Sequence, residues 1–194
     1  MTATAVLETR VEAVETERLG RLAAAARAGD RAALGALLEA IERRVYTLAY
    51  RLVRRSDAAQ DVTQEALLRV CRHLGRYRGE ASFWSWIYRI VVNQANDYWR
   101  SSARREVELE DGLAGPGFQP GREEQLRHVR EAMKSLSEKE RTALVLMDVE
   151  GFSSAEAARI LGCLSITART RAAYARKKLR RLLSRYYPEL REEA

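Results

Sequence analysis

Ser154-Ala-Glu-Ala-Ala-Arg-Ile-Leu-Gly162 is the stretch that decides the fold of the C-terminal part of this 194-residue chain. It has the length and the terminal glycine of a short capped helix. Only a few residues separate it from a longer basic segment, residues 166–186, whose apolar residues also recur at helical spacing. A short helix, a tight turn and a longer basic helix form a helix-turn-helix, whose second helix enters the major groove of DNA.

The long basic segment has a predicted inner stripe of Ala168, Ala172, Ala175, Leu179, Leu182 and Leu183. Its small residues come first, where the two helices must approach closely. At about 100° per residue, the side chains that point away from this stripe are Thr170, Ala173, Tyr174, Lys177 and Arg181, and no acidic residue interrupts the segment. A solvated basic helix would show the same charges, but the preceding short helix favours DNA binding.

Net charge and hydropathy bound the class of protein. A formal charge of +7 indicates a polyanionic partner, with nucleic acid ahead of an acidic membrane surface. No stretch approaches the roughly 20 apolar residues of a spanning helix, so we expect a cytoplasmic protein without membrane insertion. Cys71 and Cys163 form no CxxC motif and are predicted to be small core residues. No enzyme, metal or other cofactor is expected, since His73 and His128 have no obvious nucleophile or metal partner.

The N-terminal part is also predicted to be helical, which makes the fold all-α. Asp30 is expected to cap a helix over residues 31–55, and Ser56-Asp57 to cap one that ends near Leu74. A third helix is expected over residues 82–102. The buried stripe of the first of these consists of Leu34, Leu37, Leu38, Ile41, Val45, Leu48 and Leu52, and that of the third of Phe83, Trp86, Ile87, Ile90 and Val91.

These patterns divide the chain into two small helical domains joined by a flexible linker. The acidic, glycine- and proline-rich linker covers residues 106–123. The predicted order is an N-terminal extension or marginal helix over 1–18, a bundle over 19–105, the linker, a helix-turn-helix domain over 124–188 and a tail over 189–194.

Two blocks of sequence resemble the extracytoplasmic-function branch of the sigma-70 family. The first comprises Asp61-Val-Thr-Gln-Glu65, Arg76-Tyr-Arg-Gly-Glu-Ala-Ser-Phe-Trp-Ser-Trp-Ile-Tyr-Arg-Ile90, Asn93 and Asp97-Tyr-Trp-Arg100. The second comprises Leu136-Ser-Glu-Lys-Glu-Arg-Thr-Ala-Leu144, Glu150-Gly-Phe-Ser-Ser-Ala-Glu-Ala-Ala-Arg-Ile-Leu-Gly162 and Ala175-Arg-Lys-Lys-Leu179. The resemblance implies a sigma region 2 bundle, a region 4 helix-turn-helix, and a role in transcription initiation.

The resemblance also implies a partner for each surface. In that family the first domain grips the β′ coiled coil of core RNA polymerase and melts the promoter minus-ten element. Carried over, the β′ contact would consist of Asp61, Gln64 and Glu65, unless these form an ordinary solvated helix face. The minus-ten contacts would come from Tyr77, Arg78, Trp84, Asn93, Asp97, Arg100, Arg104 and Arg105. Trp84 is included because it is expected on the outer side, whereas Phe83, Trp86 and Ile87 at this spacing favour packing.

The second domain would bind the minus-thirty-five element of promoter DNA and the β flap of polymerase. Its DNA contacts would come from Thr167, Arg169, Thr170, Arg171, Ala173, Tyr174, Arg176 and Lys177. The sequence departs from the family at two positions, because relatives often carry a small residue where Ile166 stands and a basic one where Tyr174 stands. Such factors also commonly have an anti-sigma factor.

Two other classes of protein share parts of the pattern. An autonomous helix-turn-helix regulator with an N-terminal sensing or dimerising bundle would bind DNA without polymerase. A scaffold held to membranes by its basic helix is disfavoured, because the inner stripe of that helix is rich in alanine. The block from Asp61 to Arg100 separates a sigma factor from the regulator.

Overall fold

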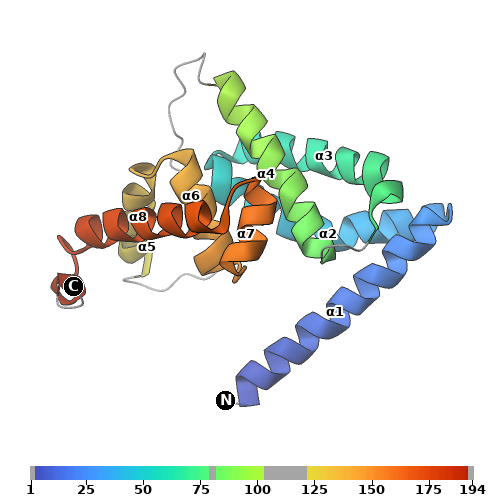
Figure 1. The fold of residues 1–194 in the computed structure, drawn as a ribbon, viewed down its shortest axis with the longest axis horizontal. Helices are drawn as coiled ribbons and strands as arrows, with labels where there is room; N and C mark the ends of the chain where they lie inside the picture. Colours follow the sequence, from blue (N-terminus) through green and yellow to red (C-terminus); the bar gives the residue numbers. More distant parts are fainter. Residues whose placement is uncertain (1–2, 79–81, 103–121, 192–194) are drawn as a thin grey trace. The chain divides into compact units, whose positions relative to one another are not determined.

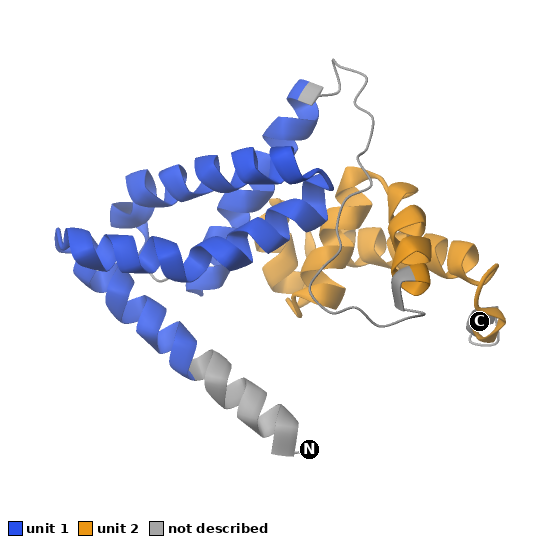
Figure 2. Cartoon of the chain, turned by 180° about the vertical axis from the view of Figure 1, so that it is seen from behind, with its two compact units in different colours: residues 1–106 blue, residues 107–194 orange. Residues whose placement is uncertain are grey.

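The computed structural model describes the backbone of residues 3–78, 82–102 and 122–191, and all of its regular elements in these ranges are helices (Figure 1). The prediction of an all-α fold is therefore confirmed. The chain divides into two compact units, residues 1–106 and 107–194 (Figure 2). The predicted linker lies outside the described residues except for its last two, which open helix α5. The domain limits drawn from the sequence therefore stay predictions.

The first unit contains helices α1 to α4. Their bounds are Ala3–Arg27, Arg31–Val53, Ser56–His73 and Phe83–Ser102, and a short 3-10 turn, Leu74–Arg76, follows α3. Residues 3–18 of the predicted N-terminal extension belong to α1, which ends ahead of Gly29 (φ 100°). Asp30 caps α2 as predicted, since its carboxylate accepts from the backbone N of Ala33 at 3.0 Å. Arg54 adopts the left-handed conformation (φ 61°) and closes α2.

The start of α3 differs from the prediction. The N-cap residue is Arg55, which makes no side-chain capping bond. Asp57 already lies in the first turn, where its carboxylate accepts from Arg55 Nη2 at 2.6 Å and from the backbone N of Ala58 at 2.7 Å. These hydrogen bonds lower the pKa of Asp57, the Arg55 bond most. The Ser56-Asp57 cap was thus predicted wrongly, because an arginine just before the helix captures the carboxylate.

Large aliphatic side chains fill the centre of the first unit. Of the stripe predicted for α2, the fully buried members are Leu37, Ile41, Val45, Leu48 and Leu52, while Leu34 and Leu38 are half-buried. From α4 the buried members are Phe83, Ile87 and Val91, while Trp86 and Ile90 are half-buried. Helices α2, α3 and α4 pack on one another around this core.

The second unit contains helices α5 to α8. Their bounds are Arg122–Lys134, Glu138–Leu144, Ser154–Leu161 and Ser165–Leu183, with a π-helical turn, Val145–Val149, after α6 and a 3-10 turn, Pro188–Arg191, at the end. Both α6 and α7 begin with a reciprocal capping box, formed by Ser137 with Glu140 and by Ser153 with Glu156. Gly162 (φ 63°) ends α7 in the conformation that favours glycine.

The inner stripe of α8 is confirmed at its small residues. Ala168, Ala172 and Ala175 are fully buried, and Leu179, Leu182 and Leu183 are half-buried. Helix α8 packs on α5, α6 and α7, and α7 contributes the equally buried Ala157. Because alanine side chains end at Cβ, the two helices of the helix-turn-helix can lie close together.

Candidate functional site

The outer surface of α3 carries the first predicted site. Asp61 and Gln64 are exposed, and Glu65 is half-buried beside them. One turn further along the same side lies Leu68, a large apolar side chain that is 49% exposed. Its helical phase was visible in the sequence, but the prediction considered only polar residues on this surface. We call Asp61, Gln64, Glu65 and Leu68 the α3 surface.

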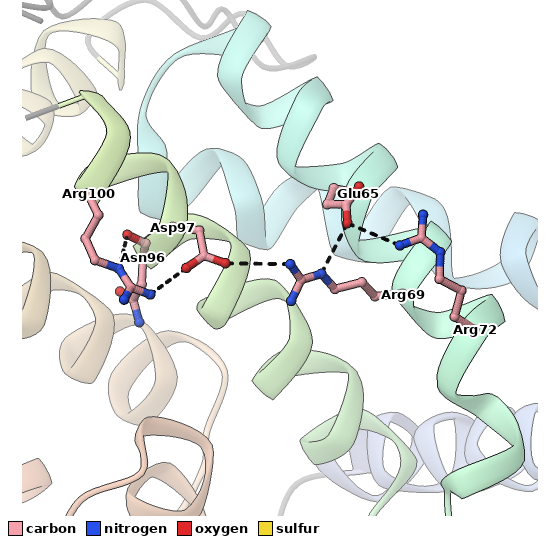
Figure 3. Close-up of polar contacts among 6 residues, drawn as sticks. All are labelled: Glu65, Arg69, Arg72, Asn96, Asp97 and Arg100. Carbon is pink, nitrogen blue, oxygen red and sulfur yellow. Dashed lines mark hydrogen bonds and ion pairs between the residues drawn. The ribbon is translucent and has the colours of Figure 1, made fainter. Parts of the chain in front are cut away.

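Arg69 joins the α3 surface to helix α4 (Figure 3). Its Nε lies 3.2 Å from Glu65 Oε1, and its Nη2 lies 3.7 Å from Asp97 Oδ2. Arg72 adds a further ion pair to Glu65 at 3.8 Å, and Arg100 pairs with Asp97 from the next turn of α4. Residues predicted to serve two different partners therefore belong to one ion-pair network.

The network changes what its carboxylates offer to a partner. Glu65 and Asp97 each have two arginines beside them, so little net negative charge remains at either position. An uncompensated carboxylate at Asp97 would repel the phosphates of nucleic acid, whereas the two arginines beside it offset that charge. Asp61 differs from both in position, since it lies about two turns of α3 before Arg69.

Trp84 does not lie on the outer side of α4, so that prediction is wrong. Its side chain is only 8% exposed and makes an edge-to-face contact with Tyr88 at a ring distance of 6.0 Å. The Arg44 guanidinium of α2 lies 4.2 Å from the centre of the Trp84 ring and donates from Nε to the Tyr88 hydroxyl at 2.9 Å. The α2 helix packs on this side of α4, and that tertiary contact fixes which aromatic residue is covered.

Three other aromatic residues pack at the start of α4. Tyr77 lies 5.4 Å from Phe83 and 5.3 Å from Trp86 between ring centres, and Phe83 and Trp86 are 5.8 Å apart. Burial raises the pKa of the Tyr77 hydroxyl. Phe83 is buried, whereas Tyr77 and Trp86 are half-buried. The predicted minus-ten residue Tyr77 is thus held in place by packing while part of its ring stays accessible.

The remaining residues of the predicted minus-ten set separate by accessibility. Arg78 is exposed just after the Tyr77 ring, and Asn93, Asp97 and Arg100 are exposed on one side of α4. Arg104 and Arg105 lie outside the described residues. The described members thus form an accessible line along α4 that starts from the aromatic cluster.

Helix α8 presents most of the predicted minus-thirty-five residues outward. The exposed ones are Arg169, Thr170, Ala173, Tyr174, Arg176 and Lys177, while Thr167 and Arg171 are half-buried. Arg176 Nη1 pairs with Asp148 Oδ1 at 2.8 Å, and Lys178 Nζ pairs with Glu140 Oε2 at 2.8 Å. Both acids come from the α6 region, so part of the charge along α8 is neutralised within the unit.

Two exposed apolar residues at the start of α8 were not predicted as site residues. Leu164, the N-cap residue, is 73% exposed and Ile166 is 58% exposed. Ile166 shares its helical phase with Thr170 and Ala173. The sequence prediction noted Ile166 only as a departure from the family. Its phase opposite the alanine stripe was the signal that could have placed it in the site.

The described side chains include no metal-binding cluster, and His128 packs against other aromatic residues. No group of three potential metal-binding side chains occurs among the described residues. His128 stacks on Tyr186 at a ring distance of 3.7 Å, and its Nδ1 lies 3.2 Å from the Tyr187 hydroxyl, so it packs the C-terminal turn against α5.

Cys71 and Cys163 are free and only half-buried, so neither is the core residue predicted. Within the described part of the chain, every helix is too short or too polar to cross a lipid bilayer.

Comparison with known proteins identifies what the two units resemble. The models for Sigma-70 region 2 and for Sigma-70, region 4 match residues 37–105 and 126–179. The ECF RNA polymerase sigma factor SigM of Mycobacterium tuberculosis is 37% identical over 163 residues, which cover 84% of this chain and 83% of that protein. The RNA polymerase sigma-H factor of Pseudomonas aeruginosa is 32% identical over 179 residues, covering 84% of this chain and 91% of that protein.

A solved structure with the same fold is that of the sigma factor RpoE in complex with the anti-sigma factor NepR from Bartonella quintana. It aligns with a TM-score of 0.62 and 25% identity, and covers 76% of this chain and 94% of that chain.

Proposed function

Since this chain belongs to the extracytoplasmic-function branch of the sigma-70 family and is an RNA polymerase sigma factor, we propose which of its surfaces bind polymerase and which bind promoter DNA. The observation that carries the proposal is the presence, in one chain and in the family's order, of region 2 and region 4. A regulator that binds DNA on its own would not need the first of these.

The α3 surface is the proposed contact with the β′ coiled coil of core polymerase. Asp61 and Gln64 offer exposed polar groups, and Leu68 adds an apolar side chain that a partner would cover. An interface centre typically combines such an apolar anchor with a few polar contacts. Glu65 has a second proposed role, because its pairing with Arg69 and Arg72 holds both arginines in place next to the interface.

The line along α4 is the proposed contact with the minus-ten element. Arg78, Asn93 and Arg100 offer donors to phosphates and bases, while Tyr77 offers part of a ring on which an unstacked base can lie. Trp84 is not part of this proposal, because its ring is covered by Arg44 and Tyr88. Arg104 and Arg105 extend the proposed site by sequence alone.

Helix α8 is the proposed reader of the minus-thirty-five element. Arg169 is exposed near the start of the helix, where a recognition helix contacts base edges. Lys177 lies two turns further on, in a position suited to phosphates. Arg176 and Lys178 contribute less charge than the sequence suggests, since Asp148 and Glu140 pair with them.

Three further parts of the proposal concern the location of the protein and two more partners. We place the protein in the bacterial cytoplasm, where RNA polymerase works. We also propose that an anti-sigma protein regulates it, because RpoE of Bartonella quintana, which shares its fold, is bound to the anti-sigma factor NepR. The β flap of polymerase is the proposed second contact of the α5–α8 unit.

Binding of the full chain to core RNA polymerase tests the proposal directly. We expect Gln64→Ala and Leu68→Ala each to weaken binding by about 1 to 3 kcal/mol, because each removes a contact that the interface covers. Ser56→Ala is the control, since Ser56 is exposed on α3 but lies two turns before Gln64 and about 140° from Asp61 around the helix. Fluorescence anisotropy with labelled chain gives the affinities. Failure of the unmodified chain to bind core polymerase or to start transcription would refute the proposal.

A further inference from the structure

The outermost line of α8 is apolar over its first two turns. Taking Ile166 as the reference direction, 100° per residue places Thr170, Ala173 and Lys177 within about 40° of it, while the buried alanines point the opposite way. Ile166 is 58% exposed, and Thr170 and Ala173 are exposed as well. We call Ile166, Thr170 and Ala173 the methyl strip, because each offers a methyl group to the outside.

Thr170 belongs to the strip because of what its hydroxyl does. Its Oγ1 donates to the backbone carbonyl of Ile166 at 2.8 Å. The only hydroxyl hydrogen is thus bound within the helix, and the side chain has no donor left for a base edge. Its hydroxyl oxygen can still accept a hydrogen bond, but the methyl group is the part of this exposed side chain that can make an apolar contact, as in the two neighbours of the strip.

Two basic side chains border the strip and indicate its occupant. Arg169 lies on one side and Lys177 continues the line, and both are exposed. No acidic residue occurs in α8. A protein partner with an apolar surface would not require cations around the strip. DNA would, because the phosphates on either side of a groove pair with basic side chains. The strip therefore fits the floor of a major groove.

Only one base presents an apolar group in that groove. Thymine carries a C5 methyl there, and contact with an apolar side chain is how proteins distinguish it. From Ile166 to Ala173 the helix advances by about 10 Å, which is the length of roughly three base pairs. Resting on the function proposed above, we propose that the methyl strip reads thymine methyl groups at up to three neighbouring positions of the minus-thirty-five element.

The test uses the full chain with core RNA polymerase. Promoter duplexes are selected from a random library by this holoenzyme, and the tightest is remade with single thymines of its minus-thirty-five element replaced by uracil. Uracil lacks only the methyl group, so base pairing and the other groove edges stay the same. We expect the replacement of each contacted thymine by uracil to weaken holoenzyme binding about four-fold, which is the contribution of one buried methyl group.

Variants of the strip connect each effect to a side chain. In Ile166→Ala and in Thr170→Ser, which keeps the hydroxyl, the uracil substitution opposite the removed methyl should have no further effect. Thr170→Val keeps the outward methyl and should retain the thymine preference. Leu164→Ala is the matched control, since Leu164 is exposed and apolar but lies ahead of the helix, and its response to uracil should equal that of the unmodified chain.

The outcomes separate the two proposals. Specific promoter binding that is unaffected by uracil, or a selected element without thymine facing the strip, overturns the inference and leaves the sigma function intact. An uracil effect that is identical in all four variants also overturns it. A holoenzyme without any sequence preference would refute the proposed function, and the inference with it.

Discussion

Two contacts in the molecule pack side chains of different size, namely the centre of the first unit and the helix-turn-helix of the second. The first unit fills its centre with Leu37, Ile41, Ile87 and Tyr88, all nearly or fully buried. In the second, the helix-turn-helix is closed by Ala157, Ala168, Ala172 and Ala175, each 0% exposed. The large side chains form a core at whose edge the Arg44 guanidinium contacts the Trp84 ring. Small ones give a close approach of backbones, which fixes the position of α8 and leaves its other side for a ligand.

Removal of Trp84 should have the largest effect on the first unit. Trp84→Ala is expected to lower the free energy of unfolding by about 3 to 5 kcal/mol, because it deletes a buried ring and leaves Arg44 without its aromatic face. Tyr174→Ala in the second unit, an aromatic ring that is 59% exposed, should change it by less than about 0.5 kcal/mol. Chemical denaturation with hydrogen exchange assigns each loss to its unit. A stable Trp84→Ala protein with impaired promoter opening would instead restore Trp84 to the DNA site.

Enlargement of the alanine stripe should come next in size. Ala172→Leu is expected to destabilise the second unit by about 1 to 3 kcal/mol, because Ala172 is fully buried and the added atoms must push α8 outward. Ala173→Leu, one residue along, points to solvent and should leave stability within about 0.5 kcal/mol. Thermal unfolding of both variants gives the comparison. Equal stability of the two would mean that the approach of α7 and α8 is not tight.

The outcome of the sequence prediction follows the same division. Caps and stripes that depend on neighbours in sequence were found correctly, as at Asp30 and at the alanines of α8. Trp84 was misplaced because its covering residue, Arg44, lies 40 positions earlier on another helix. Periodicity gives the phase of a helix, but it does not tell which partner covers the edge of its buried stripe.

Ion pairs were equally hidden in the sequence. Arg176 and Lys178 were predicted as part of an unbroken basic run, but Asp148 and Glu140 reach them from the α6 region. Arg69 was not among the predicted site residues, although it joins Glu65 to Asp97 across two helices. These pairings depend on how helices cross, and residue spacing within one helix does not encode that.

Acid should weaken the second unit through its two capping boxes. Burial alone would raise the pKa of Glu140, but hydrogen bonds from Lys178 and Ser137 outweigh it, and the pKa lies below its ordinary value near 4.5. Hydrogen bonds from Ser153 likewise lower the pKa of Glu156. A pKa that is lower in the folded state stabilises above the ordinary value and ceases to do so as the pH falls through the folded value.

We therefore expect the melting temperature of the second unit to fall as the pH drops below about 4.5, with each cap contributing on the order of 1 kcal/mol. The double variant Glu140→Gln and Glu156→Gln keeps a capping side chain at both positions and should show a flatter profile. Circular dichroism melts from pH 7 to pH 3 measure this. Parallel profiles for both proteins would assign the acid sensitivity to other groups.

The smallest effect is expected in the ion-pair network of the first unit. Asp97→Asn removes the pairs with Arg69 and Arg100, but its side chain is 46% exposed, so the loss of stability should stay below about 1 kcal/mol. The difference from the unmodified chain should shrink in 1 M salt, where such charges are screened. A loss above about 2 kcal/mol, unchanged by salt, would mean that the network is part of the core.

The alanines of the inner stripe of α8 also have a consequence for how related sigma factors can diverge in sequence. Ala168, Ala172 and Ala175 keep the helix in its place, while Ile166, Thr170 and Ala173 point the other way. On the DNA-reading role proposed above, substitutions on the outer side are expected to change the DNA preference at little cost in stability. After a gene duplication, one copy can acquire new target promoters by single steps while it keeps the fold. The same separation makes these three outer positions a compact library for building orthogonal transcription circuits.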